Sequence, residues 1–328
     1  MTERLPVGIV VPTRNSRQLL TNHLQMLKGL ESHVFEVVAV DSESTDGTLE
    51  LLEQHEGKTQ WTALAHPRGL YQSWNFGISR VTAPYTYIST VGDSITLEGL
   101  QHLVRVAEKF QADVVISKPD FVSEGGEKTE ETFWPIDDIL TSLRINQPVL
   151  LSRFEAFVFA MVNTGGAILG SSASNLYRTS MLKSRPFPVN FGTVGDGGWG
   201  MMNSFEARIA VTPEKFSTFL HHEKSYSLEE YRVNDLPLKL LKAAREALER
   251  RILEHPEELD LIKELRLMEM ANLEESALIC QMSLEKVRNS SMPWILNPEG
   301  WRARARRVTL RKQLGELKRE ALARLQRT

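Results

Sequence analysis

Residues 7–15 read Val-Gly-Ile-Val-Val-Pro-Thr-Arg-Asn and contain the first strand signal of this chain. The first five residues form a continuous, mostly β-branched run, which is typical of a strand buried on both faces in a parallel sheet. Pro12 breaks the run, and a helical spacing follows at Leu19, Leu20, His23, Leu24 and Leu27. The segment therefore predicts a strand, a polar turn at its carboxyl end, and a helix packed on the sheet.

The same pattern returns further along the chain. Phe35–Val40 is a second apolar run, and it ends in Asp41. A polar segment up to Thr48 then leads to a helix that carries Leu49, Leu51 and Leu52. Repeated strand, turn and helix predict an α/β fold with a doubly wound sheet. Because ligands of such sheets bind at the carboxyl ends of the strands, both turns are candidate binding sites.

Composition and charge narrow the functional classes. A chain of 328 residues with 41% hydrophobic residues and a net charge of −3 fits a soluble globular protein without a nucleic-acid partner. A single cysteine, Cys280, excludes an internal disulfide framework and fits a reducing compartment. We expect neither a signal peptide at the polar Met1–Pro6 nor a membrane span in the interrupted run Phe157–Leu169, and hence a cytoplasmic location.

The motifs of other nucleotide-binding α/β proteins are absent from this sequence. A dinucleotide-binding enzyme should have Gly-x-Gly-x-x-Gly after its first strand, but the chain has Pro12-Thr13-Arg14-Asn15. A P-loop is missing as well, and so is the glycine-rich turn that a sugar-nucleotide pyrophosphorylase needs at this place.

Residues 7–15, together with Val-Val-Ala-Val-Asp-Ser-Glu-Ser-Thr-Asp-Gly-Thr at residues 37–48, resemble the opening of family 2 glycosyltransferases of the GT-A fold. The second segment departs from the family at Ser42 and Glu43, where an acidic or small residue and a glycine are more usual. The resemblance implies a Rossmann-like, doubly wound mixed sheet that binds a nucleoside diphosphate sugar. Asp41 can accept the imide N–H of uracil or thymine, whereas Asp46 and Thr45 have the alternative role of capping the next helix.

A third segment, His66–Ile78, resembles the family's turn before a helix with Asn-x-Gly-Ile, which Asn75, Gly77 and Ile78 match. Arg68 is a candidate partner of phosphate oxygens or a base carbonyl, because a guanidinium pairs well with both. A solvated loop arginine is the alternative. The nucleotide-binding residues expected in the three turns and the next one are Pro12, Thr13, Arg14, Asp41, Arg68, Asn75 and Gly92.

Tyr87–Thr96 predicts a further buried strand that runs into a turn with Asp93. In the family this position carries an Asp-x-Asp-like motif that holds the divalent cation of the nucleotide diphosphate, and only Asp93 is left of it here, after Gly92. We predict Asp93 as a ligand of Mg²⁺ or Mn²⁺, because Mg²⁺ keeps waters and substrate phosphates and needs few protein ligands. Metal dependence stays open, and a cap of the following helix is the alternative.

Further downstream, His222 and Ser225 match a family strand that ends in His-x-x-Ser. The resemblance implies that His222 completes the metal shell or contacts the diphosphate, and the alternative is a structural histidine.

Residues 191–200, Phe-Gly-Thr-Val-Gly-Asp-Gly-Gly-Trp-Gly, precede a predicted helix. In the family a Glu-Asp pair at this place supplies the catalytic base; Asp196 matches the base and Gly195 replaces the glutamate. A sugar hydroxyl is a poor nucleophile until a carboxylate takes its proton. A helix-capping aspartate is again the alternative. Ser171, Ser172 and Ser174 are candidate acceptor or sugar contacts.

The resemblance ends near Ser225. It predicts a nucleotide-sugar-binding half (residues 1–118), an acceptor-binding and catalytic half (119–228) and an α-helical extension (229–328). The apolar stripes of the extension suit packing on the catalytic domain or on a second copy in a homo-oligomer. Trp294 and Trp301 beside a basic helix suit an anionic membrane surface, where lipid-linked acceptors reside, and a solvated basic helix is the alternative.

The sequence thus favours an inverting glycosyltransferase that moves a sugar, from a UDP-sugar in the first instance, to a saccharide, lipid-linked or other hydroxyl acceptor by a metal-assisted single displacement. The alternative is a non-catalytic binding or assembly module that retains this fold. Gly92 and Gly195, each in place of a usual acid, support that alternative.

Overall fold

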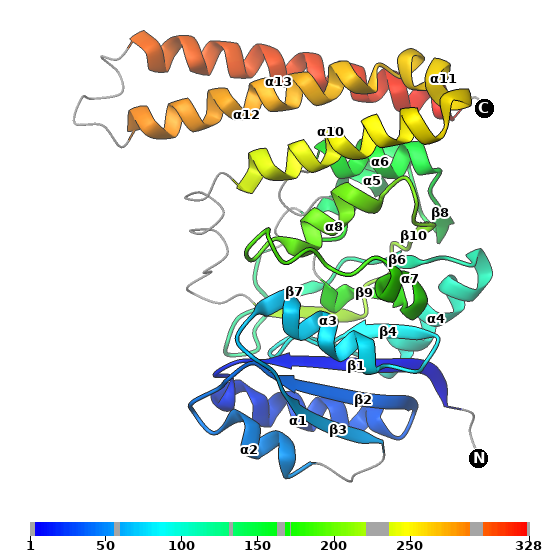
Figure 1. The fold of residues 1–328 in the computed structure, drawn as a ribbon, viewed down its shortest axis with the longest axis vertical. Coiled ribbons are helices and arrows are strands. Elements are labelled where there is room, and N and C mark those ends of the chain that lie inside the picture. Colours follow the sequence, from blue (N-terminus) through cyan, green and yellow to red (C-terminus); the bar gives the residue numbers. More distant parts are fainter. Residues whose placement is uncertain are drawn as a thin grey trace.

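Figure 1 shows the computed structural model of the chain. The structure describes residues 4–55, 60–130, 134–162, 168–170, 172–220, 236–288 and 298–326. A sheet of eight strands forms one part of the molecule, and long helices of the C-terminal region form a layer at the other end (Figure 1).

The large sheet has the order β3-β2-β1-β4-β9-β6-β10-β8. Its strands are β1 (Leu5–Thr13), β2 (Val34–Asp41), β3 (Trp61–Ala65), β4 (Tyr85–Ile88), β6 (Val114–Ile116), β8 (Val149–Leu150), β9 (Asn175–Arg178) and β10 (Ile209–Val211). The first four strands in this order are parallel, β9 runs antiparallel to both β4 and β6, and β8 runs antiparallel to β10. The predicted doubly wound mixed sheet is confirmed.

Both faces of β1 are buried, as the apolar run predicts. Val7, Ile9 and Val11 pack with helices α1 (Arg17–Glu31) and α4 (Leu97–Phe110) on one face. Val10 packs on the other face, with helix α3 (Leu70–Arg80). Successive side chains of a strand point to opposite faces, so an unbroken apolar run fills two cores. The short helix α2 (Thr48–Glu53) follows β2.

A second sheet has the order β5-β11-β7, with β5 (Ser94–Ile95), β11 (Ser217–Leu220) and β7 (Asp120–Val122). Strand β11 is antiparallel to β5 and parallel to β7. This small sheet brings the turn that carries Asp93 next to the end of β11.

The middle of the chain contributes α5 (Pro135–Leu143), α6 (Arg153–Val162), η1 (Ser172–Ser174), α7 (Thr179–Ser184) and α8 (Gly195–Asn203). The C-terminal region contains α10 (Leu236–Glu254), η2 (Pro256–Glu258), α11 (Leu259–Glu264), α12 (Leu267–Arg288) and α13 (Pro298–Leu325). Helix α10 packs on α8, and α12 and α13 pack on each other and on α6 (Figure 1). The predicted helical extension is confirmed.

One hydrophobic core joins the extension to the catalytic region. Leu240 and Leu248 of α10 share it with Trp199 of α8, Phe205 and Phe157. The extension is therefore built into the core that α6 and α8 form, and the domain boundaries at residues 118 and 228 stay a prediction. Within the described ranges, none of the helices combines the length and the apolar composition that crossing a bilayer requires.

Candidate active site

The first part of the site lies where β1 and β2 end side by side. Thr13 and Asp41 are register partners, and the Thr13 hydroxyl donates to Asp41 Oδ1 over 3.2 Å. Asp41 is 1% exposed, and it also accepts the Ser44 N–H at 2.9 Å and the Ser44 hydroxyl at 2.5 Å. A carboxylate has about four acceptor positions, so three donors leave one for a ligand. Pro12 is half-buried here and Arg14 is exposed.

The two turns are tied to each other by side chains. Asn15 accepts the Thr45 N–H at 2.9 Å. Asp46 accepts the N–H of the first residue of α1, Arg17, at 3.0 Å and that of the first residue of α2, Thr48, at 3.1 Å. The capping role is therefore the one that the structure gives to Asp46, and it stabilises two helices at once.

Glu43 and Ser42, the two residues of the second turn that depart from the family pattern, each have a distinct structural feature. Glu43 has φ +54°, a left-handed conformation that glycine adopts with less strain. The Ser42 hydroxyl accepts the Gly69 N–H at 3.1 Å and lies 2.9 Å from the Ser73 hydroxyl. Ser42 thus joins the second turn to the start of α3, next to the exposed Arg68.

Tyr71, in the first turn of α3, reaches the predicted base. Its hydroxyl lies 3.0 Å from Asp196 Oδ1, and the Gly197 N–H donates to the same oxygen over 2.8 Å. Burial raises the pKa of Asp196 from 3.8 to about 6. Oδ2 of Asp196 has no hydrogen-bond donor among the residues that the structure describes. This carboxylate is oriented through one oxygen and has the other left to accept a proton.

Gly195 has no room for a side chain. A Cβ atom there would lie 2.5 Å from the Tyr71 ring and 2.7 Å from the Pro188 carbonyl oxygen. The usual family glutamate cannot occupy this place while Tyr71 holds Asp196. The missing acid is therefore a consequence of how the Asp196 carboxylate is held.

Gly92 is constrained in a similar way. Its φ of +103° is a left-handed value, and a Cβ atom would lie 2.6 Å from Leu220 Cδ2. The next residue, Asp93, is 7% exposed and accepts the Leu220 N–H at 2.8 Å through Oδ1. Its Oδ2 accepts the Thr90 hydroxyl. Burial raises the pKa of Asp93 to about 7. Asp93 thus fastens the end of β11 to the β4–β5 turn.

These contacts do not form a metal centre with the other described residues. Three or more His, Cys, Asp or Glu side chains that could jointly hold a cation are not found in the described part of the chain. Each Asp93 oxygen accepts one hydrogen bond, from the Thr90 hydroxyl and the Leu220 N–H, and keeps one further acceptor position. The second predicted ligand, His222, lies outside the described residues. The assignment of Mg²⁺ or Mn²⁺ to Asp93 and His222 stays a prediction.

Several other candidates have structural partners. The Asn75 amide donates to the Phe187 carbonyl over 2.8 Å and accepts the Phe187 N–H at 3.0 Å, so it holds the segment before α8. Ser172 is 2% exposed, with its hydroxyl 3.0 Å from the Tyr177 hydroxyl, and Ser174 is fully buried; their predicted sugar contacts stay a prediction. They are buried because β9 and η1 lie inside the sheet region. Ser171 lies outside the described residues.

Sequence reasoning assigned no role to Tyr71. The available signal was a tyrosine in the first turn of a helix that begins at the carboxyl end of a strand, where ligand sites of α/β sheets gather. Its partner is distant in the sequence, and only the folded chain brings the two together.

The comparisons with known proteins agree with this geometry. The model of the family described as "Glycosyl transferase family 2" matches residues 8–165. The crystal structure of residues 1–349 of S. aureus TarS in complex with UDP-GlcNAc is similar, with a TM-score of 0.54 and 18% identity over 96% of this chain and 92% of that chain. The same TarS fragment in complex with UDP gives a TM-score of 0.52 and 17% identity over 99% and 92%. At such identity the likeness concerns the fold. No curated protein sequence matches this chain.

The matched segment contains the strand ends and turns that carry Thr13, Asp41, Tyr71 and Asp93, and the sheet is that of the GT-A structures. Residues 8–165 thus match a glycosyl transferase family 2 domain, and the fold of the chain is that of GT-A glycosyltransferases.

Proposed function

We propose that the protein transfers a sugar from a nucleoside diphosphate sugar to an acceptor hydroxyl with inversion at the anomeric carbon, and that Asp196 is the catalytic base. The observation that carries this proposal is the state of Asp196: a pKa of about 6, Oδ1 held by Tyr71, and Oδ2 left without a described donor. A base works best when its pKa lies near the operating pH, because it is then both ionised and basic.

The reaction is a single displacement. The acceptor oxygen attacks the anomeric carbon on the face opposite to the diphosphate, and the bond between that carbon and the β-phosphate oxygen breaks as the new bond forms. The bonding electron pair leaves with the nucleoside diphosphate. The acceptor proton moves to Asp196 Oδ2. Tyr71 keeps the carboxylate in one orientation during the transfer.

The nucleotide belongs at the carboxyl ends of β1 and β2. The open acceptor position of Asp41 suits the imide N–H of uracil, and the exposed Arg14 and Arg68 suit the diphosphate. UDP is the nucleotide that we propose, and the fold shared with a TarS structure that contains UDP supports it. We propose indirect roles for Asn75 and Gly92, which shape the pocket through Phe187 and Leu220.

The proposed displacement contains no step that requires a cation. Whether nucleotide binding depends on a metal ion is tested separately. Calorimetric titration with UDP, with and without Mn²⁺, on the wild type and on Asp93→Asn would decide it. Metal-dependent binding that is lost in the variant would support Asp93 as a ligand. Equal binding in all four titrations would contradict that assignment.

The proposal that the protein contacts a membrane rests on helix α13. Trp301 is 51% exposed and lies beside the exposed cations Arg302 and Arg306. We propose that this end of α13 contacts anionic lipid, which would place the enzyme near lipid-linked acceptors. Co-sedimentation with vesicles of phosphatidylglycerol, compared with phosphatidylcholine, tests the contact, and Trp301→Ala should weaken it. A homo-oligomer and a cytoplasmic location stay predictions.

The non-catalytic alternative loses its main support. Gly92 and Gly195 replace usual acids because backbone conformation and close neighbours leave no space for side chains there.

The decisive assay follows UDP release from UDP-sugars with acceptor saccharides. The wild type should turn over, and Asp196→Asn should lose at least about a hundredfold in rate while it still binds UDP, since general bases contribute about 10²–10⁴-fold. Equal turnover of the two proteins would refute the assignment of the base.

A further inference from the structure

The helix that carries Asp196 is poorly suited to form by itself. Helix α8 reads Gly-Asp-Gly-Gly-Trp-Gly-Met-Met-Asn. Glycine is the least favourable helix residue after proline, because it loses the most backbone freedom. The N-cap residue, Val194, makes no side-chain capping bond. Helix α8 therefore depends on tertiary contacts for its order.

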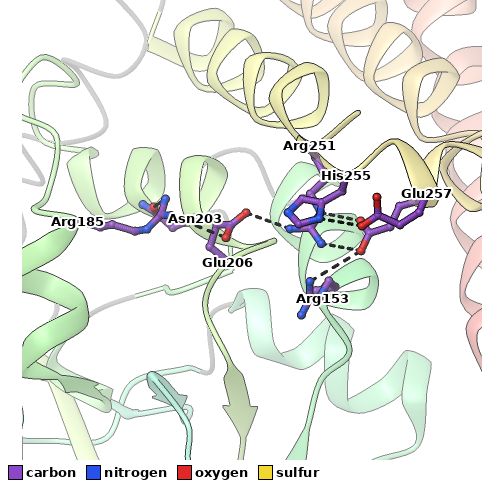
Figure 2. Close-up of polar contacts among 8 residues, drawn as sticks. Arg153, Arg185, Asn203, Glu206, Arg251, His255 and Glu257 are labelled. Atoms are coloured by element: carbon purple, nitrogen blue, oxygen red, sulfur yellow. Dashed lines mark hydrogen bonds and ion pairs between the residues drawn. The ribbon is translucent and has the colours of Figure 1, made fainter. Parts of the chain in front are cut away.

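The contacts at the C-terminal end of α8 are polar and form a chain (Figure 2). Asn203, the last residue of α8, donates to the Trp199 carbonyl over 2.9 Å and accepts from Arg185 at 3.2 Å. Arg185 also forms an ion pair with Glu206, at 3.8 Å. Glu206 in turn accepts a hydrogen bond from Arg251 at 3.2 Å. The end of α8 is thus linked to a residue of the helical extension.

Arg251 is the central residue of this network. It lies on α10, is 2% exposed, and donates two hydrogen bonds of 2.6 Å to the two oxygens of Glu258 in η2. Such a paired arrangement fixes the guanidinium in position as well as in charge. Arg153 at the start of α6 adds an ion pair with Glu258 at 3.8 Å, as Figure 2 shows. The start of α6 and the segment from α10 to η2, which are distant from each other in the sequence, are thus fixed relative to Glu206.

Apolar packing joins the same elements. Trp199 of α8 is fully buried and donates through Nε1 to the Arg185 carbonyl over 2.6 Å. Leu240 and Leu248 of α10 belong to the same core as Trp199. The Arg251 guanidinium also lies 6.0 Å from the centre of the Phe205 ring. Helix α8 is therefore held between Tyr71 at its N-terminal end and the α10 network at its C-terminal end.

We infer that the helical extension positions the catalytic helix, and that Arg251 is a positioning residue that acts through Glu206 on the placement of Asp196. The inference rests on the proposed role of Asp196 as the base. It assigns to the extension a direct influence on turnover, while the nucleotide turns at β1 and β2 lie outside the network.

The test compares three substitutions in the full chain. Arg251→Met removes the charge and keeps much of the side-chain volume. Glu206→Gln removes the charge at the α8 end only. The matched control is Arg266→Met, because Arg266 makes the same two-bond pairing with Glu269 at 2.7 Å, but on the exposed surface of the extension.

We expect Arg251→Met to lower kcat at least about tenfold while KM for the UDP-sugar and the affinity for UDP stay within about twofold. Glu206→Gln should change kcat in the same direction by a smaller factor, and Arg251→Lys should restore part of it. The control should behave as the wild type. General unfolding would lower UDP binding capacity together with activity, so the split between kcat and UDP affinity distinguishes positioning from loss of fold.

The inference is overturned if folded Arg251→Met and Glu206→Gln both retain wild-type kcat, or if kcat and UDP binding capacity fall together in both. Asp196→Asn is measured alongside. If that variant turns over normally, the assignment of the base is wrong; if it is inactive while the network variants are fully active, only the role of the extension is wrong.

Discussion

Replacement of Asp196 by asparagine should stabilise the protein at neutral pH and inactivate it. Burial raises the pKa of this carboxyl from 3.8 to about 6, so the folded protein holds the proton more tightly than the unfolded chain. The ionised form is disfavoured in the fold, and that penalty is absent below the unfolded pKa and complete once the pH exceeds the folded pKa. Asparagine cannot ionise, and its amide oxygen can still accept from Tyr71 and Gly197.

The size of the effect follows from the two pKa values. A rise from 3.8 to about 6 corresponds to about 3 kcal/mol of unfolding free energy at pH 8. The same linkage leaves only about 1 kcal/mol at pH 4.5, where both states are largely or partly protonated. Urea unfolding of the wild type and the variant at the two pH values measures the difference directly.

A matched control variant shows whether the change in stability is specific to the buried carboxyl of Asp196. Asp260→Asn changes an exposed carboxylate in the first turn of α11 and should shift stability little at either pH. If Asp196 served only as a helix cap, asparagine would replace it with little change in stability, because asparagine and aspartate cap helices about equally well. An unchanged or lower stability of Asp196→Asn at pH 8 would refute the reasoning from burial.

Three further predictions concern the surrounding residues. Tyr71→Phe should lower kcat about fivefold and leave UDP affinity unchanged, because it removes one hydrogen bond to the proposed base, worth about 1 kcal/mol; steady-state kinetics with UDP-sugar measure it. Asp41→Ala should weaken UDP binding at least about tenfold in calorimetry, since it removes the acceptor and unties the turn. Gly92 and Glu43 both have left-handed backbone conformations, which glycine adopts with less strain than other residues. Gly92→Ala should therefore destabilise the fold by more than about 1 kcal/mol, whereas Glu43→Gly should be neutral or stabilising by up to about 1 kcal/mol. Thermal unfolding of the two variants measures both effects.

Much of the architecture could be predicted because its determinants are local. The apolar runs at β1 and β2 and the polar turns after them can be recognised in short stretches of sequence, and so can an aspartate near the start of a helix, Asp196. The pairing of the strands then places the site residues: once β1 and β2 pair in parallel, Thr13 and Asp41 lie together at the carboxyl ends of the two strands.

The contacts that tune the site are not local, and sequence patterns did not predict them. Tyr71 contacts Asp196 across 125 residues, and Asp93 binds the end of β11 across 127. Arg251 lies on a helix so rich in Lys, Glu and Arg that the sequence suggests a solvated face, yet it is buried between two carboxylates. Burial of a charge depends on which partners the fold supplies, and composition does not contain that information.

Gly92 and Gly195 show how contacts between residues distant in the sequence change the functional interpretation. From sequence, Gly92 and Gly195 indicate that acids have been lost, and this favours a binding module. In the structure, a glutamate at position 195 would displace the Tyr71 ring that orients Asp196, and a side chain at position 92 would strain the left-handed backbone and press on the Leu220 side chain, next to the N–H that bonds Asp93. Each glycine makes room for the residue that holds the neighbouring aspartate. The site therefore retains one carboxylate at each place and fixes it by protein contacts, an arrangement expected of a working base more than of a degenerate one.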